Sequence, residues 1–212
     1  MNPPNREVDA RLPLALLRAM QRQDTPPELM PDEHPRSFFP HRLGLSDVVA
    51  EQIRRFRRSA RLRRRVGEAQ VEALLELIAR RSDADAVFSA AGRELAGLHF
   101  SGPAGIFRRL TKRLPQPLRR RAALRTLRTA HGAYLIAADK HLVKTAPLEI
   151  RATDPVTARI GEYGAACKLY GSLAASLLEL SGLGQTTVSH TECQRRGDER
   201  CVWRVEGDSG GR

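Results

Sequence analysis

The arrangement of three cysteines and one histidine near the carboxyl end is the feature that most constrains the fold. Cys167, Cys193 and Cys201 are the only cysteines of the chain, and His190 precedes Cys193 by three residues. Three thiolates and one imidazole make a complete tetrahedral ligand set for zinc. The seven residues between Cys193 and Cys201 include Gly197 and can fold back to bring these two thiols together. Cys167 must then come from a separate element, so a bound ion would join distant parts of the chain and stabilise the fold.

This spacing carries a stereochemical requirement. In a regular strand residues 190 and 193 point to opposite faces, so both can bind one ion only if the strand ends or bulges near Thr191. If it does not, Glu192 is the alternative oxygen ligand. Cysteine is also a small apolar residue that is frequently buried, and buried cysteines without an ion are the competing interpretation. Because four protein ligands would fill the coordination sphere, we expect a structural zinc rather than a catalytic one.

Hydrophobic periodicity predicts helices first and a sheet afterwards. The segments in which apolar residues recur at the helical period are 71–78, 87–98, 106–110 and 124–131. A further helix, long and rich in Gly and Ala, is expected at 158–180. The segments that favour strands are 133–138, 142–145, 148–152, 186–191 and 201–205. This order predicts an α+β fold in which helices pack with an antiparallel sheet.

Proline and charge divide the chain into four expected regions. Proline interrupts residues 1–44 repeatedly, and we expect an N-terminal appendage there with one short helix at about 12–23. The expected regions are the Pro-rich appendage at 1–44, a basic helix at 45–65, a ligand-binding domain at 66–206 and a disordered tail at 207–212.

The net charge of +12 comes from the middle of the chain. Residues 51–130 hold twenty basic and seven acidic side chains, with dense arginine runs at 54–65 and 108–121. Such a surface attracts polyanions, which include nucleic acid, an anionic membrane or an acidic protein. An ordinary solvated basic face is the competing interpretation. Aromatic residues make up only 5% of the chain, so a platform for stacking on bases is poorly supplied.

The sequence contains no apolar run close to the roughly 20 residues that span a bilayer. Its first 30 residues lack the apolar segment of a secretory signal. Together with the odd number of cysteines, these features predict a cytoplasmic protein without a disulfide scaffold.

Two segments of the chain resemble the 4-vinyl-reductase domain family. They are the run GEYGAACKLYG at 161–171 and the segment 190–205, in which Gly197, Asp198, Cys201 and Trp203 occupy the pattern that closes the domain. The resemblance is specific over about residues 145–206 and looser back to about residue 66. It implies a fold shared with the ligand-binding domains of nitric-oxide signalling and Golgi-transport proteins. Members include standalone proteins similar to bacteriochlorophyll 4-vinyl reductase and the sensory domains of activators that respond to phenols and related aromatics.

The resemblance also implies Zn²⁺ as a cofactor. In the sensory domains the zinc is held by a cysteine, an acidic residue and two further cysteines. The matching positions here are Cys167, His190, Cys193 and Cys201, so a histidine stands where the family has an acid. This replacement keeps a good zinc ligand and changes the net charge of the site by one unit.

A hydrophobic or aromatic small molecule is the partner that the resemblance implies, and a divinyl tetrapyrrole of bacteriochlorophyll synthesis is one candidate. For every residue that could line such a pocket, packing in the hydrophobic core is the competing interpretation. The candidate lining residues are Phe100, Phe107, Tyr134, Ile136, Tyr163 and Tyr170. His99 and His131 are candidate polar or axial ligands, against the interpretation that they are ordinary core histidines.

Reduction of a vinyl group needs a hydride donor, and the sequence shows no Gly-x-Gly-x-x-Gly fingerprint, flavin motif or iron–sulfur motif. A reaction would therefore need a donor site that these motifs do not describe, or a partner that supplies it. The alternative function is a homodimeric interaction or regulatory module. It would dock an acidic partner, a membrane surface or nucleic acid on the arginine-rich face and use the Gly/Ala-rich helix 158–180 in a dimer interface.

Overall fold

The computed structural model describes residues 6–24, 47–101, 114–143, 147–162 and 164–206. It is an α+β structure with antiparallel sheets, which confirms the predicted fold class. The α-helices are α1 (Arg11–Asp24), α3 (Asp47–Arg61), α4 (Glu68–Ala79), α5 (Ala84–His99), α7 (Gln116–Tyr134) and α8 (Lys168–Leu178). The strands are β1 (Glu7–Asp9), β2 (Arg65–Gly67), β3 (Asp139–Val143), β4 (Glu149–Thr153), β5 (Thr187–Glu192) and β6 (Cys201–Glu206). Short helical turns are η1 (Val156–Arg159), η2 (Ala165–Cys167), η3 (Glu179–Leu183) and η4 (Gln194–Arg196).

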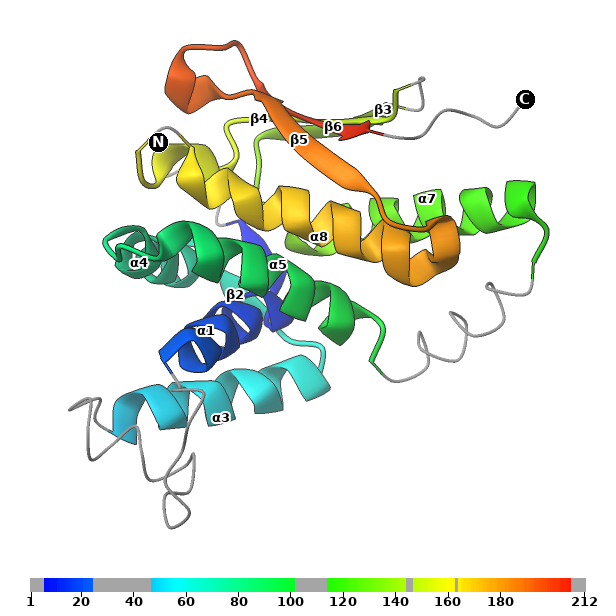
Figure 1. Cartoon of the computed structure of the whole chain (residues 1–212). Coiled ribbons are helices and arrows are strands. Elements are labelled where there is room, and N and C mark those ends of the chain that lie inside the picture. Colours follow the sequence, from blue (N-terminus) through cyan, green and yellow to red (C-terminus); the bar gives the residue numbers. More distant parts are fainter. Residues whose placement is uncertain (1–5, 25–46, 102–113, 144–146, 163, 207–212) are drawn as a thin grey trace.

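The helices are stacked in layers beneath a four-stranded sheet of order β3-β4-β6-β5 (Figure 1). α7 and α8 lie next to this sheet, α4 and α5 follow, and α1 and then α3 lie furthest from it (Figure 1). β1 and β2 form a separate antiparallel pair. One hydrophobic core of buried side chains runs through all the layers. Within the described residues, no helix combines the length and the apolar character needed to cross a bilayer.

Small residues allow α8 to pack closely on both sides. A Cβ at Gly92 of α5 would lie 2.5 Å from the carbonyl oxygen of Leu169 and 2.7 Å from the backbone nitrogen of Leu173. On the sheet side, a Cβ at Gly171 would lie 3.5 Å from Cδ1 of Trp203. Gly92 and Gly171 therefore serve close packing inside the chain, between α5, α8 and the sheet.

The predicted N-terminal appendage at 1–44 is wrong for the described residues 6–24. Leu12, Leu14, Leu16 and Leu17 of α1 are buried, because α1 lies between α3 and α5 and is apolar on more than one face. The predicted basic helix corresponds to α3, whose Ile53 also lies in the core. Residues 25–46, and the expected tail at 207–212, lie outside the described residues.

Two predicted elements differ from the structure near the sheet. α7 continues through Gly132 to Tyr134, so the predicted strand 133–138 is wrong, because a short apolar run fits a buried helix end as well as a strand. The predicted helix 158–180 is wrong in its first half, where Gly161 and Gly164 adopt positive φ angles of 73° and 76°. The helical turns that lead into α8 begin only at Ala165. The predicted strands at 148–152, 186–191 and 201–205 are confirmed to within one residue by β4, β5 and β6. The helix expected at 106–110 lies outside the described residues.

Candidate metal centre

The four side chains that the sequence singles out as a ligand set converge where α8 begins and β5 ends. One ligand atom from each of Cys167, His190, Cys193 and Cys201 lies within 4.8 Å of all the others. The Sγ atoms of Cys193 and Cys201 are 3.9 Å apart, and all three cysteines are free thiols. A tetrahedral zinc ion with Zn–S bonds of about 2.3 Å separates its sulfur ligands by about 3.8 Å. The cluster therefore has the donor set and the spacing to hold one metal ion.

A bulge in β5 allows two of these ligands to face the same point. The ladder between β5 and β6 shifts register between His190 and Glu192. This shift is the irregularity predicted near Thr191, and it brings His190 and Cys193 to one side in spite of their odd spacing. Glu192, the alternative oxygen ligand, pairs with Val202 in the ladder and is outside the cluster.

The turn after β5 fixes Cys193 through hydrogen bonds with Asp198. Beside the larger effect of Cys167, the backbone N–H groups of Arg195 and Gln194 lower the pKa of Cys193 and of Cys201, respectively. The N–H of Cys193 donates to Oδ2 of Asp198 at 2.6 Å, and the carbonyl oxygen of Cys193 accepts from the N–H of Asp198 at 3.2 Å. These donors stabilise the thiolate form of both cysteines and orient their sulfurs.

Trp203 holds two of the ligands in place. Its indole stacks on the imidazole of His190 with ring centroids 5.1 Å apart and planes inclined by 16°. Its Nε1–H donates to the carbonyl oxygen of Cys167 at 3.0 Å. The Nε2 atom of His190 is buried and has no hydrogen-bond partner among the described residues. A buried nitrogen without a partner is unfavourable, and one that faces three thiols fits the role of a metal ligand.

Gly164 provides the space that the cluster occupies. Its φ of 76° lies in the left-handed region, which favours glycine. A Cβ at this position would lie 2.6 Å from Sγ of Cys193 and 3.5 Å from Cε1 of His190. Both the backbone conformation and the close approach of the sulfur therefore require glycine here.

Contacts among the three thiols shift their pKa values in opposite directions. Contact with Cys167 lowers the pKa of Cys193 and of Cys201. The same contacts, with burial, raise the pKa of Cys167. Sequence reasoning missed Thr157, whose hydroxyl lies 3.3 Å from Sγ of Cys167, because no motif marks this residue. A divalent cation that binds the three sulfurs would displace the thiol protons, because the thiolate is the form that binds a metal ion.

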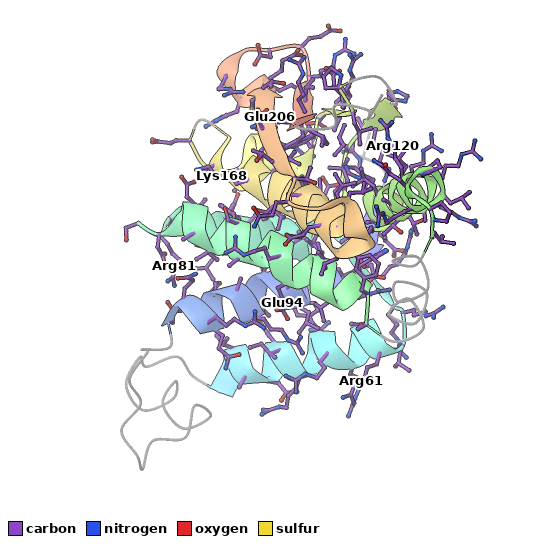
Figure 2. All side chains as sticks on the ribbon, turned by 45° about the vertical axis from the view of Figure 1, so that its right-hand side comes forward. Arg61, Arg81, Glu94, Arg120, Lys168 and Glu206 are labelled. Carbon is purple, nitrogen blue, oxygen red and sulfur yellow. The ribbon has the colours of Figure 1, made fainter. Side chains whose placement is uncertain are left out.

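A groove of about 580 Å³ opens beside the cluster, between α5, α8 and β5. Cys167, His190 and Trp203 contribute to its lining. Lys168, which extends from the start of α8 (Figure 2), forms an ion pair with Asp85 of α5 at the same groove. The groove therefore combines an entrance with charged side chains and an inner part that reaches the ligand cluster.

The candidate pocket residues that the structure describes are core residues. Phe100, Tyr134, Ile136 and Tyr170 are buried. The Tyr170 hydroxyl donates to the Tyr134 carbonyl oxygen at 3.2 Å and accepts from the Ile136 N–H at 3.3 Å. None of these four belongs to the lining of the groove beside the cluster. The two candidates outside the described residues are Phe107 and Tyr163.

His131 is held within the protein core, whereas His99 is half-buried. Nδ1 of His99 lies 3.1 Å from the hydroxyl of Tyr134, and Nδ1 of His131 lies 3.0 Å from the carbonyl oxygen of Leu127. Burial lowers the pKa of each imidazole to about 4, so both are neutral at pH 7. Neither belongs to the metal-ligand cluster.

No family model matches the sequence, and neither a curated protein nor a solved structure is detectably similar to the chain.

Proposed function

We propose that the chain is a zinc-stabilised, small-molecule-binding protein of the 4-vinyl-reductase type. The observation that carries the metal half of this proposal is the convergence of Cys167, His190, Cys193 and Cys201, with ligand atoms within 4.8 Å of one another. Three soft thiolates with one imidazole in tetrahedral spacing favour zinc over the oxygen-seeking cations.

The proposed zinc has a structural role. Its ligands come from the start of α8 and from the hairpin of β5 and β6, which are separate in sequence. Each of the three cysteines has 0% of its surface exposed, and the four protein ligands fill a tetrahedral ion. The ion would therefore hold the helix against the hairpin, and its binding energy would become folding energy.

The groove beside the cluster is our candidate for the small-molecule site. Its volume of about 580 Å³ lies within the roughly 300–1,000 Å³ that is usual for such sites. It lies between helices and sheet, where the resemblance places a hydrophobic or aromatic ligand. Arg196 in its lining supplies a cation for a carboxylate, and Lys168 would supply a second one by leaving its ion pair with Asp85. A divinyl tetrapyrrole, which combines an aromatic macrocycle with carboxylates, has the corresponding chemistry.

Purification of the full chain followed by metal analysis tests the metal half. The proposal predicts one zinc per chain, and Cys193→Ser should lose it. Protoporphyrin IX, a divinyl tetrapyrrole, is the probe for the ligand half. Its absorbance band should shift on binding to the parent protein, and Lys168→Ala combined with Arg196→Ala should weaken binding while zinc stays bound. A chain without zinc would refute the metal half, and a zinc-loaded chain that leaves the absorbance unchanged would refute the ligand half.

A further inference from the structure

α3, the turn that follows it and the first residue of β2 carry a dense set of exposed arginines, which we call the α3 arginine face. Its members are Arg54, Arg55, Arg57, Arg58, Arg61, Arg63, Arg64 and Arg65. Within the described residues only Arg54 of this set forms an ion pair, with Glu51. Several arginines elsewhere pair with acids, as Arg18 does with Glu94. The α3 arginine face is therefore a concentration of positive charge that the described chain leaves largely unneutralised.

The core fixes the direction in which these arginines point. Ile53 and Phe56 are buried at 7% and 6% exposure, so the apolar side of α3 is packed in the core. Figure 2 shows Arg61 extending outward from α3. Leu62 is the large apolar residue of this segment that is exposed, at 58%. The helix therefore offers a polar cationic surface with little apolar material to insert into a bilayer.

Two cationic grooves flank α3. The first has a volume of about 700 Å³ and is lined by Arg54, Arg55, Arg58, Arg64 and Arg65, with Glu51 as the acidic residue in its lining. The chain reverses at Arg63, whose φ is 52°, and this turn brings the last two arginines back beside the helix.

The second groove has a volume of about 680 Å³, and the residues that line it include no acid. Arg57, Arg61 and Arg63 of the α3 arginine face share it with Arg11 and Arg18 of α1, which form ion pairs with Asp9 and Glu94. Positive charge therefore lies along both sides of a helix of 15 residues, which is about 22 Å long.

We propose that the α3 arginine face docks the phosphodiester backbone of double-stranded nucleic acid. Guanidinium groups bind phosphate oxygens in pairs of hydrogen bonds, and arginines along a helix match a row of phosphates. Concave grooves fit the ridge of a backbone, whereas a flat bilayer would touch the crest of the helix. Phe56 is the aromatic residue in the first groove and is buried, so stacking on single-stranded bases has no platform there. Phosphate contacts carry no sequence information, so the binding is not sequence-specific.

This surface is independent of the metal centre. α3 lies at the side of the molecule opposite the four-stranded sheet, whereas the ligand cluster joins that sheet to α8 (Figure 1). Failure of the zinc proposal would therefore leave this inference intact, and the reverse also holds.

The test measures binding of the full chain to a fluorescent 24-base-pair DNA duplex of mixed sequence by anisotropy. Non-specific contacts give dissociation constants of about 10⁻⁴–10⁻⁶ M. Six phosphate contacts would lower the affinity by about 10³-fold between 50 and 200 mM salt. The test variant combines Arg55→Gln, Arg58→Gln and Arg64→Gln. Loss of three contacts should reduce the slope of log K against log salt by about 2.7, and the affinity near 0.1 M salt on the order of 100-fold.

The matched control removes the same charge from other exposed positions, with Arg93→Gln, Arg125→Gln and Arg128→Gln on α5 and α7. It should keep most of the affinity, and circular dichroism should show both variants folded. Equal losses in the two variants would overturn the proposal, because they would indicate attraction by net charge only. Vesicles of phosphatidylcholine and phosphatidylserine form the second arm. Binding to them without binding to the duplex would also overturn it.

Discussion

Substitution of Gly164 by alanine tests the geometry of the ligand cluster through one added methyl group. The new Cβ would lie 2.6 Å from Sγ of Cys193, about 1 Å closer than carbon and sulfur normally approach. Metal ligands tolerate displacements of about 0.2 Å, so a sulfur that moves by this amount leaves its place in the tetrahedron. The change therefore acts on metal binding as well as on folding.

Two contributions lower the free energy of unfolding of Gly164→Ala. The φ of 76° strains an alanine backbone by about 1–3 kcal/mol. The backbone and side-chain shifts that relieve the contact with Cys193 lower the free energy of unfolding by about a further 1–3 kcal/mol, which is usual for an overpacked core. We expect zinc affinity to fall by about 10–100-fold, as it does when residues that position metal ligands are replaced.

Gly197→Ala is the matched control. Gly197 has a φ of 97°, and a Cβ there would meet nothing within 4 Å. It therefore carries the backbone strain without the contact on the sulfur. Urea unfolding measures the free energy of unfolding, and competition with a chelator measures the zinc affinity. We expect Gly164→Ala to lose more stability than Gly197→Ala and to bind zinc more weakly, while the zinc affinity of the control is unchanged. Equal zinc affinity in the two variants would refute this assignment of Gly164.

Three further predictions concern the cluster and the core. Cys201→Ser should lower the melting temperature of the zinc-loaded protein, because it removes a ligand from a structural ion, and excess chelator should abolish the difference from the parent. Burial lowers the pKa of His131 from 6.5 to about 4, so the unfolded chain binds more protons than the folded chain between these values. Stability should fall by about 3 kcal/mol as the pH drops through this window, and urea titrations of His131→Gln should lack that part of the loss. Trp203 is the only tryptophan and stacks on His190, so its fluorescence should change as a chelator removes zinc. An emission spectrum that is the same with and without zinc would contradict the placement of His190 beside Trp203.

The candidate site could be predicted from the sequence because the residue types and their spacing alone identify a set of metal ligands. Three thiols and an imidazole define a ligand set by residue type, and the odd spacing of His190 and Cys193 requires an irregular strand. The register shift at His190 and Glu192 confirms that requirement. Gly164 and Thr157 could not be assigned roles in this way, because their contacts with the cluster arise only when the segment before α8 meets the hairpin.

The fold class could be predicted from periodicity, but the place of α1 could not. Its flanking prolines resemble those of a linker, and its burial depends on contacts with α3 and α5 that local sequence does not encode. The end of α7 at Tyr134 illustrates the same limit. A short apolar run satisfies a strand and a buried helix end equally, and packing against the rest of the chain decides between them.

X-ray absorption at the zinc edge of the purified protein tests the central claim most directly. We expect one zinc per chain with a coordination shell of three sulfurs at about 2.3 Å and one nitrogen at about 2.0 Å. A shell dominated by oxygen or nitrogen, or a protein that does not retain zinc when it is supplied, would contradict the assignment of Cys167, His190, Cys193 and Cys201 as a metal centre.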